Sequence, residues 1–130
     1  MSGKKRPRNP LDTPCVDPDV IRTTAASGVV FEPGRDTATV AELAERLGIK
    51  RSAAKAEIQR TIQTLTIDDF AGIFDNGFYP PSDEYGVYIN GVGIYIKLRL
   101  DHGKVNVISF HPMHDEPLRT RANTILKSKP

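Results

Sequence analysis

The sequence predicts an α+β fold in which three N-terminal helices pack on a small antiparallel sheet of three or more strands. Up to about residue 65, apolar residues recur at spacings of three and four, which indicates amphipathic helices. The later stretch "GFYPPSDEYGVYINGVGIYIKLRL" has short runs rich in Tyr, Val and Ile between turn residues, which is typical of strands. Helices that come first, instead of alternating with strands, favour α+β over a parallel α/β sheet.

Each predicted helix has a start signal and an apolar face. The first covers about residues 17–27, with proline at its first position. The second opens at Thr39, which makes a capping box with Glu42, and Gly48 closes it. Ser52 is the predicted cap of the third helix, whose apolar residues align on one face: Ala54, Ile58, Ile62 and Leu65.

Three strands are predicted at residues 85–91, 93–100 and 104–111. A three-residue loop, 101–103, with Gly103 in the left-handed conformation, joins the last two. This register is preferred because it alone gathers the apolar residues on one face: Ile94, Ile96, Leu98, Leu100, Ile108 and Phe110. The opposite face then carries Tyr95, Lys97, Arg99, Ser109 and His111, with Val105 and Val107.

This polar row has the groups that RNA cleavage without a metal requires. An imidazole such as His111 can act as general acid or base for the 2′-hydroxyl or the leaving oxygen. Tyr95 can position the phosphate or assist proton transfer, while Lys97 and Arg99 can bind it, beside Ser109. The plainer interpretation is that exposed faces of antiparallel sheets ordinarily carry Tyr, Lys and Arg.

Composition and charge describe a globular chain with basic ends. The 130 residues suit one domain, which we place at 17–116, between a flexible basic arm, 1–16, and a basic tail, 117–130. Residues 1–8 and 119–130 hold eight basic residues and no acidic one, so the intervening body is acidic although the net charge is +2. This asymmetry suggests attraction of the ends to nucleic acid, or only solubility.

Location and metal binding are bounded by what the sequence contains. A single cysteine, Cys15, permits no internal disulfide and no cysteine-rich zinc site. No secretory signal or membrane-spanning stretch is expected, so the predicted location is cytoplasmic. The cluster "HPMHDE" is interpreted as a polar loop, and no metal or other cofactor is predicted.

An ordered set of motifs resembles the MqsR family of toxins, in the RelE-like group of mRNA interferases. The motifs are "TPCVDPDVIRTTAASG", "AELAERLGI", "LTIDDF", "DEYGVY", "IYIKLRL" and "VISFH", and the likeness spans about residues 13–111. The resemblance implies a RelE-like fold and the toxin of a type II toxin-antitoxin system. Such a toxin is a metal-independent endoribonuclease that cleaves single-stranded mRNA and is silenced by a cognate antitoxin protein. Whether the ribosome takes part is left open.

The family's functional positions transfer in part. Its strand tyrosine falls on Tyr95, and its lysine after Ser-Phe falls on His111. The tyrosine of its Asp-x-Tyr motif matches Tyr85. Its lysine after Asp-Phe-Tyr falls on Gly72, which has no side chain, and its glutamine falls on the shorter Ser82.

Two other functional classes remain open. Residues 38–62 look like a helix-turn-helix that would read DNA through Lys55, Gln59 and Arg60. Alternatively, the protein is a catalytically inactive protein-interaction module of the same fold. Tyr79, Tyr85 and Tyr88 are candidates to line a groove for stacked bases, although tyrosines in strands more often pack.

Overall fold

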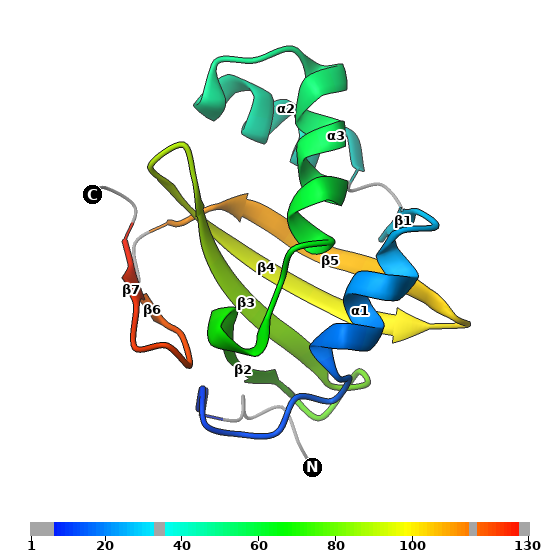
Figure 1. Ribbon diagram of the computed structural model, residues 1–130, viewed down its shortest axis with the longest axis vertical. Coiled ribbons are helices and arrows are strands. Elements are labelled where there is room, and N and C mark those ends of the chain that lie inside the picture. The colour runs from blue at the N-terminus through cyan, green and yellow to red at the C-terminus, as the bar shows by residue number, and fades with distance from the viewer. Residues whose placement is uncertain (1–6, 33–35, 115–116, 128–130) are drawn as a thin grey trace.

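The computed structural model describes residues 7–32, 36–114 and 117–127, which form three α-helices, a five-stranded sheet and a two-stranded ribbon (Figure 1). The sheet has the strand order β1-β5-β4-β3-β2, in which β1 is parallel to β5 and every other pair is antiparallel. In chain order the elements are α1 (Pro18–Ala25), β1 (Val29–Phe31), α2 (Asp36–Leu47), α3 (Arg51–Ile62), the 3-10 helix η1 (Ile67–Asp69), β2 (Phe70–Phe74), β3 (Ser82–Ile89), β4 (Val92–Asp101), β5 (Lys104–Pro112), β6 (Leu118–Arg119) and β7 (Ile125–Leu126).

The predicted arrangement of an α+β fold is wrong in two respects. The helices do not all precede the sheet, because β1 lies between α1 and α2. The sheet is mixed, because β1 pairs parallel with β5 from Val29↔Val105 to Phe31↔Val107. A three-residue strand carries too short a pattern to be seen in the sequence, and β1 is fixed by its long-range partner. The C-terminal tail, expected to be partly helical, instead forms the ribbon of β6 and β7.

The helices lie near their predicted positions, but two of the predicted caps are wrong. Asp17 does cap α1, because its carboxylate accepts a hydrogen bond from the backbone N–H two residues on. The second helix, α2, begins at residue 36, so Thr39 lies inside it and does not cap it. The N-cap of α3 is Lys50, which makes no side-chain cap, instead of Ser52. Gly48 follows α2 with a φ of +69°, as a helix-ending glycine should.

One face of the sheet, the core face, packs against the three helices (Figure 1). The apolar stripe predicted for the third helix is confirmed, since Ala54, Ile58, Ile62 and Leu65 are all fully buried. From the sheet, Ile94, Ile96, Leu98 and Phe110 are buried against them. Burial of such side chains stabilises the fold by about 1.5–3 kcal/mol each.

The hairpin of β4 and β5 has a different turn from the predicted one. Asp101 pairs with Lys104, so the loop has two residues, His102 and Gly103, both with positive φ. Ile108 then bulges out between the pairs Lys97↔Ser109 and Leu98↔Val107. The bulge separates core from surface in a way that neither regular register could. Val105 and Val107 are therefore buried in the core, and Ile108 turns to the other face.

The other face of the sheet, the second face, is partly covered by the two ends of the chain (Figure 1). Leu118 and Leu126 of the ribbon pack over Gly86. The N-terminal segment, residues 7–16, passes over Gly72, and Arg121 of the ribbon donates hydrogen bonds to two of its backbone carbonyls. The remaining basic residues of the predicted arm and tail, Lys4, Lys5, Arg6 and Lys129, lie outside the described residues.

Candidate functional site

The open half of the second face lies over β4 and β5, where neither end of the chain covers it. The register pairs Tyr95 with His111 and Lys97 with Ser109. Arg99 follows on the same side of β4, and all five side chains are half-buried. The structure thus brings together Tyr95, Lys97, Arg99, Ser109 and His111, which we call the polar row.

His111 is held in one tautomer. Its Nδ1 lies 2.8 Å from the backbone carbonyl oxygen of Pro112. Because a carbonyl only accepts, Nδ1 carries the hydrogen and Nε2 carries the lone pair. Burial lowers the pKa of this imidazole below its ordinary value, which favours the neutral form. The ring lies 5.2 Å from that of Tyr95 and is stacked at 4.2 Å on that of His114.

Tyr95 has its hydroxyl engaged away from the row. The hydroxyl donates to the carboxylate of Glu84, a fully buried side chain on β3. Glu84 also accepts two hydrogen bonds from Arg8 of the N-terminal segment, with Nε–Oε1 at 2.9 Å and Nη2–Oε2 at 3.2 Å. Burial, together with the charge of Glu84, raises the pKa of the Tyr95 phenol far above its ordinary value. The phenol is therefore a fixed donor and a support for His111.

The two cations of the polar row differ in how firmly they are held. The Lys97 ammonium lies 3.8 Å from the centre of the Phe74 ring. Arg99 pairs with Glu32 through Nη2 at 3.4 Å and with Asp101 through Nε at 3.2 Å. Arg99 is thus oriented by two carboxylates, whereas Lys97 is placed by a ring that leaves its charge uncompensated by that contact.

The two remaining predicted site residues lie in different places. Ser82 is buried but lines the same hollow as Lys97 and Arg99. Tyr85 is on the core face, fully buried, and packs edge-on against Phe70 with ring centres 5.7 Å apart. Burial raises the pKa of its hydroxyl. The structure therefore does not bring Tyr85 to the polar row.

Two adjoining hollows flank the polar row and share Ile108, the bulged residue. One, of about 510 Å³, is lined by aromatic and cationic residues that include Tyr79, Lys97 and Arg99. The other, of about 290 Å³, lies where α2 meets β5 and is lined by Ser109 and His111. Together they form a groove that runs across β4 and β5 beside the imidazole.

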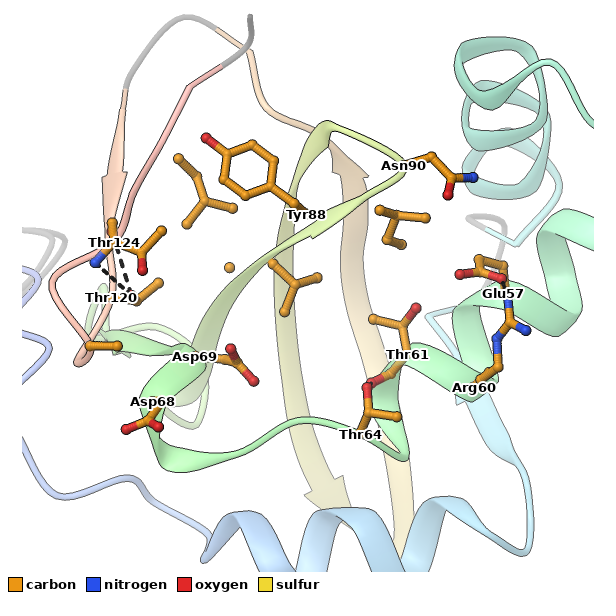
Figure 2. Close-up of a pocket in the computed structure, with 15 residues that line it drawn as sticks. Glu57, Arg60, Thr61, Thr64, Asp68, Asp69, Tyr88, Asn90, Thr120 and Thr124 are labelled. Carbon is orange, nitrogen blue, oxygen red and sulfur yellow. Dashed lines mark hydrogen bonds and ion pairs between the residues drawn. The ribbon is translucent and has the colours of Figure 1, made fainter. Parts of the chain in front are cut away.

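A separate hollow of about 600 Å³ lies between α3, η1, β3 and the ribbon (Figure 2). Its lining includes the carboxylates of Glu57, Asp68 and Asp69 and the hydroxyls of several threonines. Arg60, the cation on its wall, pairs with Glu57. Burial raises the pKa of Asp69. This acidic hollow is poorly suited to a phosphate and contains none of the predicted site residues.

Metal and membrane features were sought within 7–32, 36–114 and 117–127. Across these residues, no three His, Cys, Asp or Glu side chains lie close enough to hold a metal ion. Over the same ranges, no helix has the length and apolar character to cross a membrane. His114 lies 3.6 Å from Glu42. Asp115 and Glu116, which complete the "HPMHDE" cluster, lie outside the described residues.

Comparison with models of known protein families found no match, and searches of curated proteins and of solved structures found none either. The family resemblance carried by the sequence motifs therefore stays a prediction.

Sequence reasoning missed the two residues that hold Tyr95. Alternation from Ser82 puts Glu84 on the second face, so its charge in a strand could have been noticed. Arg8 is separated from Glu84 by 76 residues, and no local pattern connects them. Its pairing depends on how the N-terminal segment crosses Gly72, which only the folded chain shows.

Proposed function

We propose that the polar row binds single-stranded RNA and cleaves it without a metal ion, as the toxin of a toxin-antitoxin pair in the cytoplasm would. The observation that carries the proposal is the state of His111. Its Nδ1–H is held by a backbone carbonyl, its pKa is lowered, and it lies on one face with Lys97 and Ser109. A neutral, oriented imidazole beside a cation is suited to activate a 2′-hydroxyl next to a phosphate.

The reaction follows from these groups. Nε2 of His111 takes the proton of the 2′-hydroxyl, and the 2′-oxygen forms a bond to phosphorus. The bond from phosphorus to the 5′-oxygen breaks, and that oxygen takes a proton from water. The products are a 2′,3′-cyclic phosphate and a 5′-hydroxyl. Lys97 and Arg99 stabilise the negative charge that develops on the phosphorane, and Ser109 donates a hydrogen bond to it.

Tyr95 is a positioning residue in this proposal. Because its hydroxyl donates to Glu84, its pKa is raised too far for proton transfer near neutral pH. Its ring instead supports one side of the imidazole at 5.2 Å. We expect Tyr95→Phe to keep most of the activity and Tyr95→Ala to lose more, because the ring and not the hydroxyl touches His111.

The DNA-reading alternative has less support from the arrangement of α3. Gln59 donates to the backbone carbonyl of Ala25 at 3.2 Å, and Arg60 pairs with Glu57. Of the three candidate reading residues, two are thus engaged within the protein, while Lys55 is exposed. Duplex DNA binding that is lost in Lys55→Ala would favour this class. A tight protein partner without any nuclease activity would favour the interaction module.

The test is cleavage of a defined single-stranded RNA by the purified protein in EDTA. We expect His111→Ala to cut at least a hundredfold more slowly. His102→Asn is the matched control, because His102 is exposed on the β4–β5 turn with a φ of +51°, which asparagine tolerates. Equal cutting by wild type and His111→Ala would disprove the role of this histidine. No cutting by the wild type, with or without ribosomes, would overturn the proposal.

A further inference from the structure

The 510 Å³ hollow beside the polar row has two kinds of wall. Phe74, Tyr79 and Pro80 form a flat, apolar wall at the end of β2 and in the loop that follows. Lys97 and Arg99 of β4 provide cations on the opposite strand, and Ile108 forms its boundary with the hollow of His111. A hollow with a flat apolar wall, a charged wall and a neighbouring imidazole suits a ligand that is itself flat on one side and anionic on the other.

Tyr79 is the feature of this wall that the fold does not explain. Its side chain lines the hollow and is nevertheless 71% exposed. Its loop has defined geometry, because the side chains of Asp75 and Asn76 accept hydrogen bonds from the backbone N–H groups of Gly77 and Phe78, both at 3.0 Å. Two prolines follow it. A large ring held out by a structured loop favours a binding role over packing.

The charges of the hollow favour an anion next to that ring. Lys97 and Arg99 outnumber Glu32, the carboxylate among its lining residues. Lys97 lies over the face of Phe74, so the ring left for a flat ligand is that of Tyr79. A nucleotide meets both requirements, since every base has a π face and is linked to a phosphate. An acidic peptide would satisfy the cations but would leave Tyr79 without a partner.

We propose that this hollow is a base-binding subsite, in which one nucleobase of single-stranded RNA stacks on Tyr79. Its phosphate lies against Lys97 and Arg99, and the chain continues past Ile108 to His111. The inference rests on the proposed function for the direction of the chain toward His111. It adds a residue that fixes the substrate through stacking, which is tolerant of base identity because stacking uses no hydrogen-bond pattern.

The test separates binding from cleavage by using an oligonucleotide with 2′-O-methyl groups, which lacks the attacking hydroxyl. Fluorescence anisotropy measures its affinity for the wild type and three variants. We expect Tyr79→Ala to bind about tenfold more weakly and Tyr79→Phe to bind as the wild type, because stacking needs the ring alone. Tyr88→Ala is the matched control, since Tyr88 is an exposed tyrosine on the separate acidic hollow.

A set of oligonucleotides with one abasic position each identifies the stacked base. At the position that occupies the subsite, removing the base should weaken binding to the wild type, and Tyr79→Ala should then cause no further loss. Equal affinity of Tyr79→Ala and wild type for the intact strand would overturn the inference. Tyr79-dependent binding of a polyglutamate peptide would replace the nucleobase with an acidic partner. Tyr79-dependent RNA binding without cleavage would keep the subsite and refute only the nuclease.

Discussion

The covered and open halves of the second face use charge in opposite ways. In the covered half, Glu84 is fully buried and is satisfied by Arg8 and Tyr95. In the open half, Lys97 and Arg99 are half-exposed and border a hollow. Strand β4 supplies side chains to both, with Tyr95 and Lys97 two residues apart on the same side. The difference indicates that the chain ends convert one half into structure and leave the other available for a ligand.

Removing Arg8 should have the largest effect on stability. Arg8→Met leaves the buried Glu84 carboxylate with the Tyr95 hydroxyl as its remaining partner from this pair. A buried charge without its counter-ion is costly, and because Arg8 is itself 24% exposed we expect a loss of about 2–3 kcal/mol. The free energy of unfolding, measured in urea at pH 7, checks this value.

Arg119→Met is the matched control for Arg8. Arg119 is exposed on the ribbon and donates to the neighbouring side chain of Asn123. Its loss should change the free energy of unfolding by less than about 0.5 kcal/mol. Similar values for the two variants would show that the buried pair contributes no more than a surface contact, and the contrast between the two halves would fail.

Gly86→Ala should cause a smaller loss by pushing the ribbon away from the sheet. A Cβ at Gly86 would lie 2.7 Å from Cδ2 of Leu118 and 2.9 Å from Cδ1 of Leu126. These side chains must shift, which we expect to cost about 1–2 kcal/mol. Hydrogen exchange should become faster at residues 118–126 and remain unchanged in β4.

A control for Gly86 is Gly103→Asn on the β4–β5 turn. A Cβ at Gly103 meets no atom within 4 Å, and asparagine tolerates its φ of +72°. Unchanged exchange at residues 118–126 in Gly86→Ala would mean that the ribbon accommodates the methyl group without moving.

Local pattern in the sequence predicts the polar row but not its surroundings. Alternation along β4 places Tyr95, Lys97 and Arg99 together whatever the loop, because residues two apart share a face. The bulge at Ile108 could not be predicted, since it depends on which residues of β5 the helices bury. The same limit applies to Arg8, whose partner is distant in sequence. Sequence therefore predicts which side chains share a strand face, whereas tertiary packing decides which of them remain open.

Lys97 tests the open half directly. Lys97→Met removes the charge over Phe74, a cation–π contact worth about 0.5–1 kcal/mol at a partly exposed site, so the free energy of unfolding should fall by no more than that. Affinity for the 2′-O-methyl oligonucleotide should fall about fivefold, because one phosphate contact is lost. A large loss of stability with unchanged affinity would assign Lys97 to the structure instead of the ligand.

The smallest effect concerns the pH dependence of cleavage. The pKa of His111 is lowered chiefly by burial, while its Nδ1–H bond to Pro112 and the Glu42 carboxylate act in the raising direction. A base works when deprotonated, so kcat/KM should stay constant as the pH falls to about 6.5, the ordinary imidazole pKa. It should decline only below that value, as His111 becomes protonated.

The charges of His114 and Lys97 contribute to the same lowering, after burial. Lys97→Met should therefore move the acidic limb slightly toward neutral pH, in addition to its effect on affinity. Profiles of kcat/KM between pH 5 and 8, together with an NMR titration of the His111 ring, measure both shifts. A limb well above pH 6.5 in the wild type would mean that the titrating base is not this buried imidazole. The shared groove of His111 and Lys97 would then bind RNA without supplying the base.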